Sequence, residues 1–210
     1  MNTKPILYSF RRCPFAIRAR MALASSGIQV ELREVKLSDM PESMLQLSPK
    51  ATVPVLLSSD GLVVDESLDV MVWCLSQSDP EGWLDIDAAS NQLIQRFDEE
   101  FKPLLDCYKY ADRHPDFSQL QHRIRAEVFL HELNQLLSLN AYLSAAQCRL
   151  TDVAIFPFIR QFAGVDAAWF ERSEYAFVRN WLNGMLGSPR FQTVMTKYPF
   201  WRPGDEAVYL

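Results

Sequence analysis

The stretch PILYSFRRCPFAIRARMALASSG, residues 5–27, decides the fold because it changes from one kind of secondary structure to another. Its first part, PILYSF, is a compact apolar and aromatic run that is typical of a strand. From Pro14 to about Ser25 the residues are good helix formers, and Ile17 is the one β-branched residue among them. Gly27 follows as a helix stop. The stretch therefore predicts a strand followed by a helix.

Cys13, between these two elements, is the first candidate for chemistry. It precedes Pro14, which suits the first helical position because proline lacks the N–H group that has no partner there. Cys13 then lies at the N-cap, where unpaired N–H groups and the helix dipole favour a thiolate. Four arginines add positive charge nearby: Arg11, Arg12, Arg18 and Arg20. The alternative is that Cys13 is an inert core residue, as most single cysteines are.

The residues that follow extend this start into a small α/β domain. Residues 28–35 alternate apolar and polar positions, which predicts a second strand parallel to the first after a right-handed crossover. VPVLL and LVV flank the turn signal SSDG and predict an antiparallel hairpin. Residues 65–77 begin with acidic residues and continue with helical apolar spacing. The order β-α-β-β-β-α is typical of the thioredoxin-like group, and we assign this domain to residues 1–78.

The second half of the chain has a different pattern. Residues 79–88 are rich in proline, glycine and aspartate and are predicted to be a linker. Helical apolar spacing then recurs without a convincing strand over 89–112, 118–140, 151–163, 175–186 and 188–197. The predicted fold class is therefore α/β plus all-α, with an all-helical substrate domain over residues 89–210.

The composition limits the function. The chain has 210 residues and a formal net charge of −5, which argues against nucleic acid or an anionic membrane as the main partner. No apolar run predicts a signal peptide or a membrane helix. The four cysteines, Cys13, Cys74, Cys107 and Cys148, lack the spacing of a zinc site, so we expect no metal and reduced thiols in the cytoplasm.

Two further motifs could hold a ligand in front of Cys13. In ATVPVL, Pro54 begins a strand, so the backbone of Val53 can pair with an extended peptide ligand. In DES, residues 65–67, Ser67 and the N–H groups of a helix start can hold a carboxylate, while Glu66 can pair with an ammonium group. The alternatives are a trans proline that merely starts a strand and an ordinary acidic helix start.

Together, FRRCPFAIRAR, SPKATVPVL and DES resemble the glutathione site of the cytosolic glutathione transferase superfamily. TDVAIFPFIRQF in the helical half extends the resemblance over essentially the whole chain, and CPF is most similar to the cysteine-type classes, above all the omega class. The resemblance implies that the cysteine forms a mixed disulfide with glutathione, that the proline is cis and that the protein is a homodimer. The implied residues are Cys13 as nucleophile and Phe15, Val53, Pro54, Glu66 and Ser67 as glutathione-binding residues.

The sequence departs from the omega pattern at two positions. Omega-type sequences usually carry a lysine where Met40 stands, which leaves open whether Lys36 or Lys50 replaces it. The family usually has Ser or Thr three residues before the aspartate that matches Asp152, and Arg149 stands there instead. The cap of that helix is therefore expected to be weaker or built differently.

A dithiol cycle is excluded at this motif because Ala16 occupies the position of a resolving cysteine. We expect a monothiol cycle in which Cys13 takes glutathione from a mixed disulfide or a glutathionyl adduct and a second glutathione releases it. Such a site favours deglutathionylation, dehydroascorbate reduction or reduction of glutathionyl adducts, with glutathione as co-substrate.

Two other classes of protein compete with this interpretation. The first is a non-catalytic, dimeric adaptor or regulator with the same fold. The second is a chloride intracellular channel-like protein, whose start also reads CPF. The four arginines of residues 11–20 would make membrane insertion of this segment costly.

Overall fold

The computed structural model describes residues 4–210, which form two compact units. The first contains the chain up to Leu84 together with Ser188–Leu210, and the second is Asp85–Gly187. The division after Leu84 falls within the expected linker, residues 79–88. The expected helical domain, 89–210, extends too far, because its last segment belongs to the first unit.

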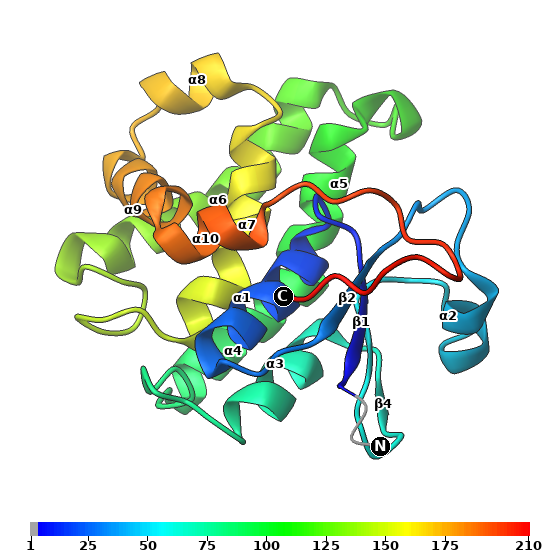
Figure 1. The fold of residues 1–210 in the computed structure, drawn as a ribbon. Helices are drawn as coiled ribbons and strands as arrows, with labels where there is room; N and C mark the ends of the chain where they lie inside the picture. Colours follow the sequence, from blue (N-terminus) through cyan, green and yellow to red (C-terminus); the bar gives the residue numbers. More distant parts are fainter. Residues whose placement is uncertain (1–3) are drawn as a thin grey trace. The chain divides into compact units, whose positions relative to one another are not determined.

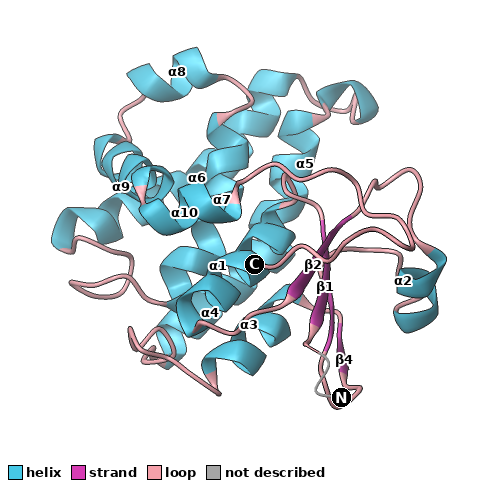
Figure 2. Cartoon of the chain, viewed as in Figure 1, coloured by secondary structure: helices cyan, strands magenta, loops and turns pink. Residues whose placement is uncertain are grey.

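The first unit contains a four-stranded mixed sheet flanked by helices (Figures 1 and 2). The strands are β1 (Ile6–Ser9), β2 (Glu31–Glu34), β3 (Val55–Leu57) and β4 (Val63–Val64), and the helices are α1 (Pro14–Ser26), α2 (Glu42–Leu47), α3 (Ser67–Leu75) and α10 (Pro189–Val194). The sheet order is β2-β1-β3-β4, with β1 parallel to β2 and antiparallel to β3, and β3 antiparallel to β4. This confirms the expected mixed sheet and adds one helix, α2, between β2 and β3.

Helix α1 begins and ends as its sequence predicts. Pro14 is its first residue, and Gly27 at its end has a φ of 73° and donates its N–H to the carbonyl of Leu23. A left-handed C-cap of this kind favours glycine, which has no Cβ to clash. The helix packs against α3 and α10 and is buried over most of its length.

The end of the chain covers the free edge of strand β2. The N–H of Leu32 donates to the carbonyl of Val208 at 2.7 Å, and Val30 and Leu210 exchange bonds of 3.0 and 3.4 Å. The N–H of Trp201 donates to the carbonyl of Glu34 at 2.8 Å. The red segment of Figure 1 therefore lies along β2, an arrangement that no strand pattern in the sequence indicated.

A buried ion pair joins α1 to strand β2. The guanidinium of Arg20, which has no exposed surface, pairs with the carboxylate of Glu34 and also donates to Ser9 Oγ at 2.8 Å and to the carbonyl of Val194 at 3.0 Å. The other oxygen of Glu34 accepts from the backbone N–H of Arg11 at 2.7 Å. Burial lowers the pKa of Arg20, and the Glu34 carboxylate opposes that shift. The pair therefore connects α1, β2, the turn before α1 and α10.

The second unit is helical throughout its regular elements. They are α4 (Ala88–Arg96), a π-helical turn (Phe97–Phe101), α5 (Lys102–Lys109), a 3-10 turn (Ala111–Arg113), α6 (Gln119–Leu139), α7 (Leu150–Ala163), α8 (Ala167–Arg172) and α9 (Ala176–Gly187). The short helix α8 was not expected, and the other helices fall within the expected ranges to within a few residues. Among residues 4–210, no helix combines the length and apolar character that crossing a membrane requires.

Asp152 organises the start of α7. Its buried carboxylate accepts the N–H groups of Leu143 and Arg149, at 2.9 and 3.0 Å, and the indole N–H of Trp181 at 2.9 Å. The bond from the N–H of Arg149 to Asp152 is the half of a capping box in which the third helical residue accepts from the N-cap backbone. The helix start is therefore built differently from one capped by Ser or Thr, as the departure at Arg149 predicted.

We expect Glu34→Ala to lower the free energy of unfolding by about 3–5 kcal/mol, because it leaves the Arg20 charge buried without its partner. Urea denaturation monitored by circular dichroism would measure this loss. Glu31→Ala on the same strand is the matched control, since the Glu31–Arg33 pair is partly exposed and is expected to contribute about 1 kcal/mol or less. Equal losses for the two variants would contradict a central role for the Arg20–Glu34 pair.

Candidate active site

Cys13 lies at the N-cap of α1, as its place before Pro14 predicted. Its backbone is extended, with φ −73° and ψ 124°, and its carbonyl accepts the N–H of Ile17 at 3.0 Å. The N–H of Cys13 donates to the carbonyl of Phe10 at 3.0 Å, which closes the turn after β1. The thiol is half-buried and lies at the positive end of a helix of 13 residues.

The Cys13 thiol faces the segment that leads into β3. Its Sγ donates to the carbonyl of Val53 at 3.6 Å, and the Val53–Pro54 peptide bond is cis. Val53 is buried in an apolar cluster with Tyr8 and Ala16, and Cys13 packs against that cluster. The resemblance implied a cis proline at this position, and the structure confirms it.

Glu66 and Ser67 lie at the start of α3, where the DES motif predicted them. Glu66 is the N-cap and its side chain is exposed, whereas Ser67 is the first residue of the helix and is buried. Ser67 Oγ accepts from the buried guanidinium of Arg18 at 3.4 Å. The hydroxyl proton of Ser67 therefore remains available to donate to an acceptor at the helix start.

Lys50 lies beside the same motif. Its ammonium is 2.6 Å from Glu66 Oε1 and 3.0 Å from Asp65 Oδ1. Hydrogen bonds to Glu66 and Asp65 raise the pKa of Lys50, and bonds from Ser48 and Lys50 lower the pKa of Asp65. Of the two lysines considered as replacements at Met40, Lys50 is thus paired with the DES motif, while Lys36 is exposed in the loop after β2. Met40 itself packs against the apolar cluster.

The arginines near Cys13 have structural roles that the sequence did not reveal. Arg20 is neutralised by Glu34, and Arg18 is buried and lies 5.4 Å from the ring centroid of Phe15. The expectation that all four arginines add charge around the thiol therefore needs correction for Arg20, whose charge is paired with Glu34. Phe15 is half-buried and is the second residue of α1, next to Arg18.

Tyr8 is fully engaged inside the first unit. Its hydroxyl accepts from Arg33 at 2.6 Å and donates to Ser43 Oγ at 3.0 Å, and its side chain is 1% exposed. A tyrosine that activates a bound thiol must present its hydroxyl to the ligand. Tyr8 does not do so in this structure.

The remaining cysteines differ from Cys13 in their surroundings. Cys74 is buried on α3, and burial raises the pKa of its thiol to about 12. Cys107 and Cys148 are half-buried in the second unit, and none of the four cysteines forms a disulfide within residues 4–210. Within residues 4–210, no group of three or more metal-ligating side chains comes together.

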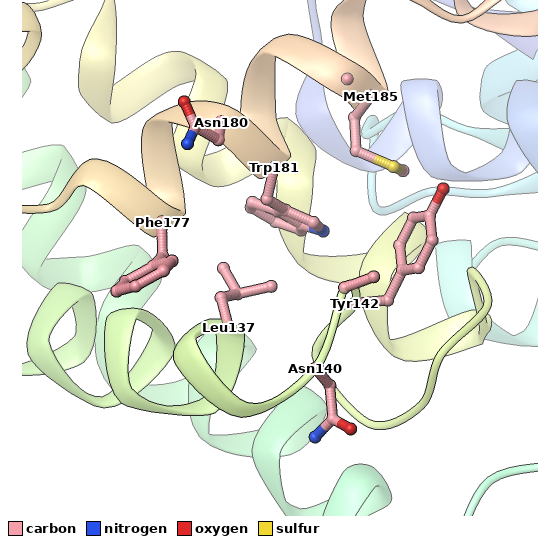
Figure 3. A pocket seen from close by; sticks show the side chains of 9 residues that line it. Leu137, Asn140, Tyr142, Phe177, Asn180, Trp181 and Met185 are labelled. Carbon is pink, nitrogen blue, oxygen red and sulfur yellow. The ribbon is translucent and has the colours of Figure 1, made fainter.

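A hollow of about 350 Å³ lies in the second unit, between the end of α6, the loop after it and α9 (Figure 3). Leu137, Phe177, Trp181 and Met185 supply apolar surface, with the amides of Asn140 and Asn180 at the sides. Its lining contains neither a cysteine nor a charged residue. The residues singled out in the sequence, Cys13, Val53 and the start of α3, belong to the first unit.

Comparison with known proteins finds similar sequences. The family "Glutathione S-transferase, N-terminal domain" matches residues 7–82. "Glutathione S-transferase omega-1" of Sus scrofa is 27% identical over 174 residues, which are 80% of this chain and 66% of that protein. "Glutaredoxin 2" of Escherichia coli (strain K12) is 34% identical over 65 residues, which are 31% of this chain and 30% of that protein. The match thus spans just under two thirds of the pig protein's length.

The fold recurs in solved structures. A glutathione transferase family member from Pseudomonas fluorescens pf-5, solved with two glutathione bound, has a TM-score of 0.79 and covers 93% of each chain at 17% identity. This similarity identifies the fold as a thioredoxin-like unit followed by a helical one.

Under native conditions we expect iodoacetamide to label Cys13 and to leave Cys74 unmodified. Alkylation requires the thiolate, which a helix N-terminus favours and which burial at Cys74 disfavours. Peptide mass spectrometry after a timed reaction at pH 8 would give both rates, with a difference of about tenfold or more. In urea the two thiols should react alike, and rapid labelling of Cys74 in the folded protein would contradict the assignment.

Proposed function

Because the chain belongs to the glutathione transferase superfamily and is similar to its omega class, we propose that it is a glutathione-dependent thiol transferase whose nucleophile is Cys13. The observation that carries the proposal is the position of the Cys13 thiol, at the N-cap of α1 and 3.6 Å from the carbonyl that precedes cis-Pro54. This position combines stabilisation of a thiolate with backbone groups that can hold a peptide-like ligand.

The first chemical step is a thiol–disulfide exchange. The Cys13 thiolate attacks the glutathione sulfur of a glutathionylated substrate, so that a Cys13–glutathione bond forms and the substrate leaves as a thiolate that takes up a proton. In the second step a free glutathione thiolate attacks the same glutathione sulfur. Oxidised glutathione leaves and the Cys13 thiolate is restored, so that the substrate disulfide is reduced at the expense of glutathione.

Glutathione itself has to act as the resolving thiol in this cycle. Ala16 is fully buried at the position where a dithiol motif carries its second cysteine. Cys74, the other cysteine of the first unit, is buried and has a raised pKa. A monothiol cycle is therefore the one that the residues around Cys13 support.

The proposed glutathione contacts follow the geometry of the first unit. The backbone of Val53 pairs with the cysteinyl part of the ligand, and Phe15 and Pro54 border the thiol. Glu66 pairs with the γ-glutamyl ammonium, and Ser67 donates its hydroxyl to the adjacent carboxylate. Support for this assignment comes from the common location of Cys13, Val53 and the start of α3 in one unit.

Incubation with oxidised glutathione should add one glutathionyl group to the protein, and intact mass spectrometry would detect it. Cys13→Ser should abolish the addition and reduce turnover of a glutathione mixed disulfide to background, because no other thiol replaces the nucleophile. Cys107→Ser is the matched control and should behave like the unmodified protein. Addition that persisted in Cys13→Ser would place the chemistry at another cysteine.

We also expect faster turnover of a glutathione mixed disulfide and of a glutathionyl aromatic ketone than of a chloronitroarene. Conjugation to an electrophile needs a glutathione thiolate stabilised by a hydroxyl, and the hydroxyl of Tyr8 is occupied by Arg33 and Ser43. Initial rates at equal substrate concentrations would test this order. The reverse order would contradict the thiol-transferase proposal.

The non-catalytic alternative predicts a different pair of results. An adaptor with this fold would be retained on immobilised glutathione without turning over any mixed disulfide. We further propose a homodimer in the cytoplasm, on the basis of the resemblance and the four free thiols. Light scattering at several protein concentrations would measure the oligomeric state.

A further inference from the structure

Lys50 contacts the start of α3 at the carboxylates that are proposed to lie next to the ligand. Its ammonium lies between two carboxylates, 3.0 Å from Asp65 Oδ1 and 2.6 Å from Glu66 Oε1. Glu66 is the residue proposed to pair with the ammonium group of glutathione. A cation of the protein itself therefore pairs with that carboxylate in this structure.

The two carboxylates hold Lys50 in different ways. Asp65 is anchored, because its second oxygen accepts from the hydroxyl of Ser48 at 2.7 Å and Ser48 is fully buried. Glu66 has no such anchor and makes no side-chain cap bond to α3. Lys50 can therefore leave Glu66 while it stays attached to Asp65.

The backbone presents Lys50 to this pair of carboxylates. Ala51, which follows it, has a φ of 53°, and its N–H donates to the carbonyl of Ser48 at 3.2 Å. This left-handed turn brings Lys50 and Ser48 to the same end of α3 from one short segment.

Resting on the proposed function, we propose that Lys50 makes the site selective for a ligand that carries a free amino-acid head, with both its ammonium and its α-carboxylate. Before a ligand binds, Lys50 neutralises Glu66. On binding, the ligand ammonium takes over Glu66, and Lys50, retained by Asp65, pairs with the ligand α-carboxylate beside Ser67.

Counting the charge pairs explains the selectivity. A ligand with both charges removes one pair, between Lys50 and Glu66, and forms two new ones. A ligand that has the ammonium but lacks the carboxylate removes the same pair and forms only one. Lys50 therefore weakens binding of the second ligand. For the first ligand, the new pair between Lys50 and the α-carboxylate offsets the loss of the Lys50–Glu66 pair.

The effect is expected to be modest because the groups are partly exposed. The side chains of Lys50 and Glu66 are 50% and 64% exposed, and pairs of this kind contribute little and are screened by salt. At low ionic strength, we expect the loss of the Lys50–Glu66 pair and the formation of the pair between Lys50 and the ligand α-carboxylate each to change the affinity by about two- to fivefold.

The test compares two ligands in which the thiol is blocked by methylation, so that no disulfide chemistry interferes. The first is S-methylglutathione, and the second is its analogue with γ-aminobutyrate in place of glutamate, which lacks the α-carboxylate. Isothermal titration calorimetry at low salt would measure both dissociation constants for the unmodified protein and for Lys50→Met. Lys197→Met serves as the control with the same change of charge, because Lys197 is exposed near the end of the chain.

We expect Lys50→Met to bind the aminobutyryl ligand about two- to fivefold more tightly. Its preference for S-methylglutathione over that ligand should fall by a similar factor, and Lys197→Met should change neither. In a Glu66→Gln background the gain for the aminobutyryl ligand should disappear, because Lys50 then has no carboxylate at that position to release.

The inference is overturned if Lys50→Met leaves the aminobutyryl affinity unchanged or weakens it, or if the preference between the two ligands persists. Such a result alongside a normal Cys13–glutathione adduct would leave the proposed function intact. If the unmodified protein binds neither ligand and forms no adduct, the proposed function and the inference fail together.

Discussion

The buried pair between Arg20 and Glu34 is the interaction on which the first unit depends. A charged pair without solvent is tolerated only when its remaining hydrogen-bonding groups are satisfied, and Ser9, Val194 and the N–H of Arg11 satisfy them here. These partners come from the end of a strand, from a helix near the end of the chain and from the turn before α1. One pair of side chains thus sets the positions of segments that lie far apart in the sequence.

The position of Cys13 is a consequence of this arrangement. Glu34 holds the N–H of Arg11, and the carbonyl of Phe10 accepts the N–H of Cys13, so the turn that carries the thiol is connected to the buried pair through two successive bonds. The opposite side of the candidate site comes from the cis peptide before Pro54 and from the start of α3. The candidate site is therefore built on backbone groups and on the core below them, and Glu66 is the exposed residue among the glutathione-binding residues that the sequence predicts.

Much of the secondary structure of the first unit could be predicted from the sequence, because the residues that determine it are close together along the chain. Helix α1, with Pro14 at its start and Gly27 at its end, and the hairpin of β3 and β4 follow from propensity and turn residues alone. Long-range pairing could not be predicted in the same way. The cover over β2 arises from hydrogen bonds between segments about 170 residues apart along the chain, for which single-sequence periodicity has no signal. For the same reason, the sequence shows Arg20 only as a charge close to Cys13 along the chain, and it does not distinguish Lys36 from Lys50.

The cover over strand β2 also bears on how the protein avoids self-association. An uncovered edge strand offers a row of N–H and C=O groups to any other extended chain, and this is a common route to aggregation. Here residues 201–210 take up those groups on β2, while the opposite edge of the sheet, β4, is only two residues long and offers little to a passing strand. The last segment of the chain therefore protects the sheet in solution, and an affinity tag that disturbs it would reduce the yield of folded protein more than one placed elsewhere.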